Sequence, residues 1–271
     1  MRTITIEGDA MPVLGLGTWQ LEGADCCDAI RSALDMGYRH IDTATMYGNE
    51  AEIGQELGKS DIPRDQLWIT SKIRREHLHH DDVLASIDKS LERLACDYLD
   101  LALIHWPNED VPLRETMLAL KEIRKEGRIR HIGVSNFTPS QVREARELAP
   151  IITNQVECHL FLQQHEMYEL LRSHEMVLTA YSPLARGGVE EDETVQRLAD
   201  KHDASPEQIA IAWQLHREAV VAIPKASSEK HLRSNMEALS ISLDDEDLET
   251  VRSLDRGERI IDPEFAPAWG T

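Results

Sequence analysis

Four side chains able to donate, accept or stabilise a proton lie at or just beyond the ends of apolar, strand-like runs of this sequence. They are Asp42, Tyr47, Lys72 and His105. A charged side chain at the end of a buried strand costs free energy unless it has a partner or a function. Neighbouring strands lie about 4.8 Å apart, so side chains at their ends can meet. The spacing therefore predicts a proton-transfer site built from several strand ends.

Together these side chains suit the reduction of a carbonyl group. Tyrosine is a weak acid with an unperturbed pKa of about 10, and a nearby ammonium stabilises the phenolate and lowers that pKa. Lys72 can act in this way on Tyr47, while Asp42 supplies the carboxylate that a buried lysine needs. His105 can donate a hydrogen bond to the oxygen that Tyr47 protonates. No side chain supplies hydride, so this chemistry requires a nicotinamide cofactor.

The elements that must position these residues alternate along the chain. Short apolar runs are separated by amphipathic stretches, which is the pattern of parallel strands joined by helices. Strands are predicted at residues 14–16, 39–42, 67–71, 99–104, 129–134, 152–156, 177–180 and 220–223. Helices are predicted at residues 24–36, 50–57, 81–94, 113–126, 139–148, 164–173, 193–202 and 206–217.

These eight alternating units predict an α/β fold, a (β/α)8 TIM barrel made by a single domain of residues 1–271. The chain length is close to the roughly 250 residues typical of such a barrel. Active sites in this fold are built from the C-terminal ends of the strands and the loops that follow them. Asp42, Lys72 and His105 would lie at the ends of strands two, three and four, so they should share one site.

Additional segments flank the barrel pattern. They are an N-terminal β-hairpin with strands at 3–6 and 11–13 around residues 7–10, two extra C-terminal helices at about 229–237 and 245–255, and a tail over 256–271. We expect the hairpin to plug the N-terminal mouth of the barrel. The tail should be mostly irregular, because Pro263 and Pro267 each remove a backbone donor.

The charge of the chain is unusual, with 49 acidic against 29 basic residues and a net charge of −20. Such a surface repels nucleic acid and anionic membranes. Only eight of the basic residues are lysine, which favours a protein adapted to high salt over an ordinary acidic enzyme.

No apolar stretch approaches the roughly 20 residues needed to span a bilayer. The start of the chain lacks the apolar core of a signal peptide, so the expected location is cytoplasmic. The cluster of His77, His79 and His80 lacks a closed ligand set, and we predict no metal site.

Several ordered motifs make the sequence similar to a known family. They are Gly15-Leu16-Gly17-Thr18-Trp19, Asp42-Thr43-Ala44 with Tyr47-Gly48-Asn49-Glu50, Thr70-Ser71-Lys72, Leu103-Ile104-His105-Trp106-Pro107, Gly133-Val134-Ser135-Asn136-Phe137, Asn154-Gln155-Val156-Glu157, Ala180-Tyr181-Ser182-Pro183-Leu184 and Ile223-Pro224-Lys225. On these motifs the chain resembles the aldo-keto reductase family over nearly its whole length, especially the prokaryotic members similar to diketogluconate reductases.

The resemblance implies NADPH-dependent reduction of aldehydes or ketones to alcohols by a monomer acting on a small-molecule carbonyl substrate. It implies that Tyr47 is the general acid, that Lys72 and Asp42 tune it, and that His105 orients the substrate carbonyl. It also implies a cofactor bound in an extended form, without a Gly-rich phosphate loop. The residues that it assigns to the cofactor are Ser135, Asn136 and Gln155 for the carboxamide, Tyr181 for the nicotinamide ring, Ser182 and Leu184 for the pyrophosphate, and Lys225 and Ser227 for the 2′-phosphate.

The chain departs from the family pattern on the adenosine side. His231 stands where an arginine is common, and Ser234 replaces a glutamate beside Asn235. A neutral imidazole holds a phosphate less firmly than a guanidinium. We therefore expect NADPH to be preferred and NADH to be used as well, with His231 and Asn235 contacting the adenosine.

The substrate side departs too, because Arg74 replaces an aromatic residue two positions after Lys72. Arg74 either pairs with a carboxylate on the substrate or turns outwards to pair with Glu76. Trp19 and Trp106 follow strands one and four, so we expect them to line an aromatic substrate pocket. Phe265 and Trp269 in the tail either close this pocket or only anchor the tail.

Two other classes of function stay open from the residues alone. Lys72 could form a Schiff base, as in an aldolase, although this leaves Tyr181 and Lys225 unexplained. A barrel of this kind can also serve as a non-catalytic nucleotide-binding or structural protein. The complete set of Asp42, Tyr47, Lys72 and His105 argues against that second alternative.

Overall fold

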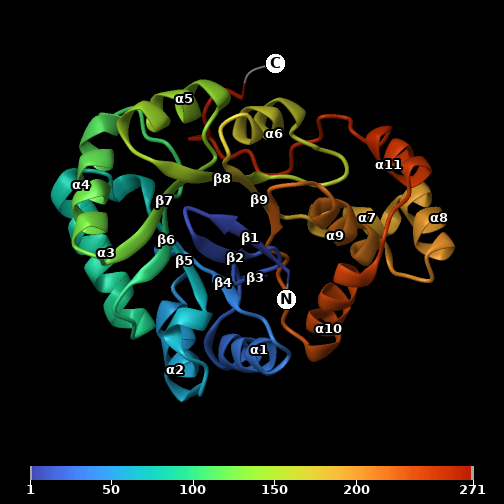
Figure 1. Ribbon diagram of the computed structural model, residues 1–271, viewed down its shortest axis with the longest axis horizontal. Helices are drawn as coiled ribbons and strands as arrows, with labels where there is room; N and C mark the ends of the chain where they lie inside the picture. Colours follow the sequence, from blue (N-terminus) through green and yellow to red (C-terminus); the bar gives the residue numbers. More distant parts are fainter. Residues whose placement is uncertain (1, 270–271) are drawn as a thin grey trace.

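Eight parallel strands form the central sheet of the computed structural model, which describes residues 2–269 (Figure 1). Their order in the sheet follows their order in the chain. The strands are β3 (Leu16–Gly17), β4 (His40–Asp42), β5 (Trp68–Ile73), β6 (Leu99–Ile104), β7 (Ile129–Ser135), β8 (Ile151–Glu157), β9 (Val177–Tyr181) and β10 (Val220–Ala222). The predicted (β/α)8 barrel is confirmed.

The first and last strands close the barrel around a glycine. Parallel bridges join Leu14 to Ala222 and Gly17 to Lys225. A Cβ atom on Gly17 would lie 2.6 Å from the carbonyl oxygen of Ile223, closer than real Cβ atoms approach. Gly17 is therefore required by the close approach of two strands, and the Gly-Leu-Gly motif belongs to the barrel wall rather than to a phosphate loop.

The helices that follow the strands lie on the outside of the barrel (Figure 1). Two of them begin with a capping hydroxyl that precedes a proline: Thr138 accepts from the backbone of Gln141, and Ser205 accepts from that of Gln208. In both, the glutamine side chain bonds back, which completes a capping box. The helices are α1 (Gly23–Asp35), α2 (Glu50–Lys59), α3 (His80–Leu94), α4 (Leu113–Lys125), α5 (Pro139–Leu148), α6 (His165–Arg172), α8 (Glu193–Lys201) and α9 (Pro206–His216).

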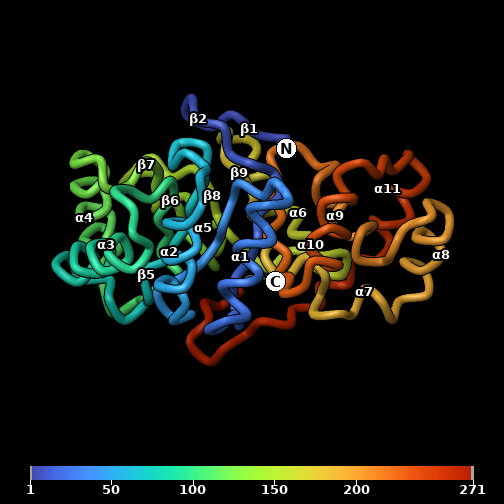
Figure 2. Tube along the Cα trace, turned by 90° about the horizontal axis from the view of Figure 1, so that it is seen from below, coloured from blue at the N-terminus to red at the C-terminus, as the bar shows by residue number. Residues whose placement is uncertain are grey.

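The N-terminal hairpin of β1 (Thr3–Ile6) and β2 (Asp9–Pro12) lies at one end of the barrel, opposite to the C-terminal tail (Figure 2). Ile6 and Met11 pack with Trp68 and Leu101 inside the barrel, so the hairpin plugs this end as expected. Its turn is shorter than the predicted loop over residues 7–10. Glu7 and Gly8 have φ values of 49° and 96°, the positive pair that a two-residue type I′ turn requires.

The C-terminal part also follows the expectation, with extra helices α10 (Glu229–Glu237) and α11 (Asp245–Arg252) before an irregular tail. The segment after β9 lies between the predicted elements, and it forms a 3-10 turn, Ala185–Gly187, and the short helix α7, Gly188–Glu191. Val189 is fully buried there, and this tertiary packing orders residues whose own sequence does not favour a helix. In residues 2–269, no helix combines the length and apolar character that a bilayer crossing needs.

Candidate active site

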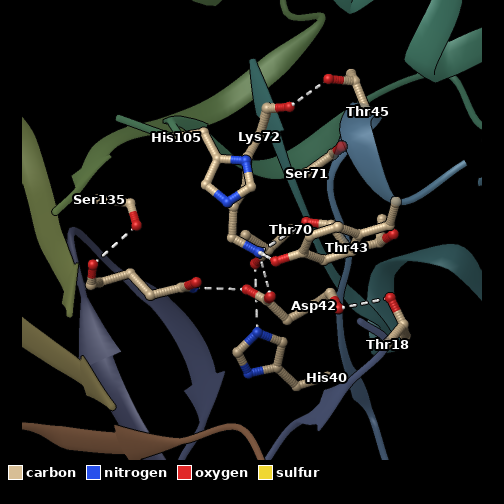
Figure 3. Close-up of polar contacts among 12 residues, drawn as sticks. Thr18, His40, Asp42, Thr43, Thr45, Thr70, Ser71, Lys72, His105 and Ser135 are labelled. Carbon is tan, nitrogen blue, oxygen red and sulfur yellow. Dashed lines mark hydrogen bonds and ion pairs between the residues drawn. The ribbon is translucent and has the colours of Figure 1, made fainter. Parts of the chain in front are cut away.

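A buried ion pair lies at the C-terminal end of the barrel. Nζ of Lys72, on β5, is 2.5 Å from Oδ1 of Asp42, the last residue of β4, and donates to the carbonyl oxygen of Thr43 at 2.9 Å (Figure 3). The side chains of Lys72 and Asp42 are only 1% and 2% exposed. The hydroxyl of Tyr47 lies 3.3 Å from the same ammonium. Asp42, Tyr47 and Lys72 therefore contact one another, as the sequence predicted.

For Lys72 and for Tyr47, burial and the neighbouring charges shift the pKa in opposite directions. Burial alone would lower the pKa of Lys72, but Asp42 and Tyr47 together outweigh it and leave that pKa above its usual value. Burial raises the pKa of Tyr47, and the Lys72 ammonium offsets only part of that rise. The lowering that we expected from Lys72 is therefore present, but it is not the larger effect. The lysine stays charged and the tyrosine keeps its proton at neutral pH.

His105 follows β6 and stands beside Tyr47, with ring centroids 5.7 Å apart in an edge-to-face arrangement. Burial, followed by the charges of Lys72 and Arg74, holds the pKa of His105 well below its ordinary value. The imidazole is thus neutral and carries one N–H. Its Nδ1 atom is buried without a hydrogen-bond partner in the part of the chain that the structure describes. A buried polar atom left unpaired calls for an explanation, and a role in the chemistry of the site is one such explanation.

Next to the ion pair, side chains with amide and hydroxyl groups from β7, β8 and β9 form a polar wall of the site. Gln155 donates from Nε2 to Oδ2 of Asp42 at 2.7 Å. Ser135 donates from Oγ to the backbone oxygen of Gln155 at 2.8 Å. Asn136 accepts the Tyr181 hydroxyl at 2.8 Å. Gln155 therefore connects this polar wall directly to the carboxylate of the ion pair.

A cavity of about 490 Å³ opens over these residues. Most of the residues that the sequence predicted for a site line it, while Lys72 lies beneath it and is held by Asp42. The lining residues already predicted are Trp19, Asp42, Tyr47, His105, Trp106, Ser135, Asn136, Gln155, Tyr181, Ser182 and Lys225. Besides Lys72, five predicted residues are not part of the lining: Arg74, Leu184, Ser227, His231 and Asn235.

Arg74 is the clearest departure from the prediction of a substrate contact. The strand β5 ends at Ile73 and the chain leaves the barrel, so the alternation that would have turned Arg74 inwards stops one residue earlier. Its Nε atom lies 3.5 Å from the carboxylate of Glu76, and its side chain is 48% exposed. The structure therefore supports the alternative in which Arg74 turns outwards to pair with Glu76.

The residues expected near the adenosine lie around the start of α10. Ser227 and His231 are exposed, and the backbone N–H of His231 is capped by Ser228. Asn235 is buried instead, at 4% exposure. It lies beside the side chain of Tyr38, whose hydroxyl donates to the Leu232 carbonyl, so in this structure it packs inside the protein rather than facing the cavity.

Sequence reasoning missed part of the cavity wall. Phe265 lines the cavity and packs edge-on against Trp106 at 5.4 Å, which favours the alternative in which the tail closes the pocket. Trp269 packs on the same ring at 6.1 Å. The tail has no periodicity that would have revealed this position. The missed lining residues are Gly17, Thr18, Met46, Arg186, Ile223, Ile260, Ile261, Asp262 and Pro263.

Comparison with known proteins identifies the family of this chain. The model of the aldo/keto reductase family matches residues 13–256. The chain belongs to the aldo/keto reductase family. It is 40% identical over 266 residues to methylglyoxal reductase DkgB of Escherichia coli O157:H7, covering 96% of this chain and 99% of that protein. It is 38% identical over 257 residues to glyoxal reductase of Bacillus subtilis (strain 168), covering 93% of this chain and 92% of the other.

Solved structures agree with this placement. The crystal structure of a putative 2,5-diketo-D-gluconic acid reductase B matches 100% of this chain and 98% of its own, with a TM-score of 0.97 and 39% sequence identity. The predicted resemblance to the family, including its members similar to diketogluconate reductases, is confirmed. This aldo/keto reductase is an oxidoreductase that reduces carbonyl groups to alcohols with NAD(P)H.

Proposed function

We propose that this aldo/keto reductase reduces aldehydes or ketones with NADPH as the preferred cofactor and with Tyr47 as the general acid. The observation that carries the proposal is the chain of contacts from Asp42 through Lys72 to the Tyr47 hydroxyl, which ends at the cavity. A proton donor backed by a fixed ammonium is what carbonyl reduction needs, because negative charge develops on the carbonyl oxygen.

Each side chain then has a distinct part in the proton transfer. Tyr47 donates its hydroxyl proton to the carbonyl oxygen, and the Lys72 ammonium stabilises the phenolate that remains. Asp42 keeps Lys72 charged and in place. His105 is neutral, so it orients the carbonyl through its single N–H and leaves the proton transfer to Tyr47. The nicotinamide cofactor supplies the hydride.

The fit of the cofactor is tested by the direction of the Gln155 amide. Asp42 is an acceptor when ionised, so Gln155 must turn its NH₂ group towards it at 2.7 Å. The carbonyl oxygen of Gln155 is then left as an acceptor for a ligand, and a primary carboxamide such as that of nicotinamide provides the matching donor. Ser135 and Asn136 would hold the same carboxamide, and the ring of Tyr181 would support the nicotinamide.

The charged end of the cofactor would lie towards Lys225, which is exposed at the edge of the cavity. Ser182 and Leu184 would contact the pyrophosphate. His231 and Ser227 are exposed near the same edge, at the start of α10, where a 2′-phosphate would meet an imidazole instead of a guanidinium. Lys225 favours NADPH, and the weaker partner at 231 leaves NADH as a second cofactor. Asn235 joins this group only if it gives up its contact with Tyr38.

The lining of the cavity supports small or apolar carbonyl substrates. Trp19, Trp106 and Phe265 provide aromatic surface, while Ile260 and Ile261 add aliphatic surface. Two relatives carry names that state reduction of methylglyoxal and of glyoxal. We therefore place small aldehydes and dicarbonyls first among the substrates to test, followed by aromatic aldehydes.

The experiment is a panel of these aldehydes and ketones, assayed with NADPH and with NADH. We expect turnover with both cofactors and a larger kcat/KM for NADPH. Turnover with NADH alone, or with neither, would contradict the proposal.

Borohydride trapping in the presence of substrate tests the Schiff-base alternative. No adduct at Lys72 is expected, because that amine is buried and charged by Asp42 and so lacks a free lone pair. A trapped adduct would favour the aldolase-like function.

A further inference from the structure

The C-terminal tail forms one wall of the cavity although it lies outside the regular helices and strands. Ile260, Ile261 and Pro263 line the cavity together with Phe265. A segment of this kind has no ladder of backbone hydrogen bonds to fix its path, so its backbone groups need other partners. At the start of the tail, the backbone N–H groups of Arg256 and Glu258 donate to the carbonyl oxygen of Phe161. Beyond Glu258, the position of this wall depends on the side chains that hold the tail.

Glu157, the last residue of β8, holds the tail backbone. Its side chain is fully buried, with 0% exposed. Oε1 accepts the backbone N–H of Ile260 at 2.8 Å, and Oε2 accepts that of Ile261 at 2.9 Å. The Arg259 guanidinium lies 3.8 Å from Oε2. Hydrogen bonds to an ionised carboxylate are stronger than bonds between neutral groups, so this contact fixes the tail at two successive residues.

His159 completes the set of donors around this carboxylate. Its Nδ1 accepts the backbone N–H of Phe161 at 3.3 Å, so Nε2 carries the proton and donates to Oε1 of Glu157 at 3.0 Å. Burial alone would raise the pKa of Glu157, but the hydrogen bonds from His159, Ile261 and Ile260 outweigh it and leave the pKa below its ordinary value. The carboxylate stays ionised and keeps its hold on the tail at neutral pH.

The outer part of the tail folds back onto the anchored part. The Arg259 guanidinium lies 3.7 Å from the ring centroid of Trp269, whose Nε1 donates to Asp262 at 2.9 Å. Phe265 and Trp269 both pack on the ring of Trp106. Phe265, which lines the cavity, and Trp269 therefore depend on a backbone that is held four to nine residues earlier.

We propose that Glu157 is a positioning residue that holds the tail against the cavity and so sets the affinity for carbonyl substrates with bulky apolar or aromatic substituents. The proposal rests on the carbonyl reduction proposed above. Glu157 acts on the substrate only through the tail and leaves the reacting atoms to Tyr47 and His105. Small aldehydes that do not reach the tail gain nothing from this anchor.

The test uses Glu157→Gln, which keeps the shape of the side chain but turns one acceptor into a donor that faces a backbone N–H. Cleavage of the folded protein by trypsin after Arg259, followed by mass spectrometry, should be about tenfold faster because the tail opens locally more often. KM for a bulky aromatic aldehyde should rise about tenfold, which corresponds to the loss of one or two hydrogen bonds. The value of kcat/KM for methylglyoxal and the Kd for NADPH should change less than about twofold.

Three further variants keep this test decisive. Glu264→Gln makes the same chemical change at an exposed position of the tail and should alter neither trypsin cleavage nor substrate preference. Ile261→Pro removes one donor N–H from the tail and leaves the barrel untouched, and Ile261→Ala controls for the loss of a side chain that lines the cavity. The proline variant should exceed its alanine control in both effects even if Glu157→Gln folds poorly.

Wild-type protection from trypsin and an unchanged ratio of kcat/KM between the two aldehydes, in Glu157→Gln or in Ile261→Pro, would overturn the proposal. If the wild-type protein reduced no aldehyde, the proposed function would fail and with it the role in substrate choice. The trypsin result does not depend on turnover, so it would still decide whether Glu157 holds the tail.

Discussion

The two ends of the barrel both bury a histidine among charged groups, but they satisfy it differently. At the N-terminal end, His131 of β7 lies 3.0 Å from Glu7 and 2.9 Å from Asp9, one carboxylate at each ring nitrogen. Its ring stacks on Trp68 with a centroid distance of 5.4 Å. At the C-terminal end, Nδ1 of His105 has no hydrogen-bond partner within residues 2–269.

This difference separates a structural network from a reactive one. Both nitrogens of His131 bond to the turn of the hairpin and hold it on the barrel, so neither ring nitrogen is left for a ligand. At the other end, the hydroxyl of Tyr47 and the ring of His105 face a cavity. Fully satisfied buried networks add rigidity, whereas incompletely satisfied groups in a cavity mark a place where chemistry can happen. Substitutions at the two ends should therefore affect different observables.

The largest effect is expected for Tyr47→Phe, which removes the acidic proton and keeps the ring. Carbonyl reduction should fall by about 10²–10⁴ in kcat, the range for loss of a general acid. The Kd for NADPH and the unfolding midpoint should stay near the wild-type values. Steady-state kinetics and cofactor fluorescence measure the two quantities, and a variant that kept most of its kcat would remove Tyr47 from the mechanism.

The pH profile of the same reaction probes the state of Tyr47 directly. A general acid must be protonated to work, and the pKa of Tyr47 lies above its usual value. The value of kcat/KM for reduction should therefore stay level through neutral pH and decline only above about pH 10, by about tenfold per unit. Tyr47→Phe should lack this decline. A fall centred near pH 7 in the wild type would instead point to a histidine as the acid.

The substitution His231→Arg tests the exposed position near the start of α10 that is proposed to meet the 2′-phosphate. A guanidinium at this exposed position would add a charged hydrogen bond to a 2′-phosphate, worth about 1.5–3 kcal/mol. We expect the Kd for NADPH to fall accordingly and that for NADH to change little. Fluorescence titration with both cofactors measures this, and His231→Gln serves as the uncharged control. Equal changes for the two cofactors would show that residue 231 does not face the 2′ position.

The structural end is tested by His131→Phe, which keeps an aromatic ring against Trp68 but removes both hydrogen bonds. Glu7 and Asp9 are partly exposed, at 35% and 41%, so water can solvate them once the imidazole is gone. The free energy of unfolding should drop by only about 1–3 kcal/mol. Urea denaturation gives this value, and kcat should remain within about twofold of wild type. A loss of turnover without a loss of stability would invalidate the contrast between the two ends.

The smallest effect concerns salt. Screening of the −20 net charge should raise Tm as KCl is added, with much of the gain below about 0.15 M, where the Debye length is near 8 Å. The Asp42–Lys72 pair is buried and should be insensitive, so kcat should change little over the same range. A thermal melt across a KCl series measures this. Gains that continue into molar KCl would support salt adaptation, and a flat Tm would leave an ordinary acidic enzyme.

Much of the barrel could be predicted because buried parallel strands are nearly continuous apolar runs. Residues 99–104, for example, form β6 as expected. The same logic found the site, since Asp42, Lys72 and His105 interrupt apolar character where their strands end. Local turn chemistry was harder to predict. The pair Glu7-Gly8 forms a shorter turn than expected because a non-glycine residue accepts a positive φ there.

The cavity wall could be predicted only in part, because its remaining pieces depend on contacts distant in sequence. Ile260 and Phe265 lie in a segment without periodicity, and their positions follow from Glu157 about 100 residues earlier, since Oε1 of Glu157 holds the backbone N–H of Ile260 at a separation of 103 positions. Arg74 was placed by extending the alternation of a strand one residue too far. Asn235 was assigned by resemblance, and its packing against Tyr38 is a property of the folded chain.

The end of β8 holds two side chains of separate consequence, two residues apart on one face. Gln155 donates a hydrogen bond to the buried carboxylate of Asp42, and Glu157 accepts one from the backbone of the tail. On the roles proposed above, proton transfer and substrate selectivity therefore depend on different contacts. During evolution, insertions, deletions or substitutions in the tail can therefore change the substrates of this protein while Asp42, Lys72 and Tyr47 stay the same.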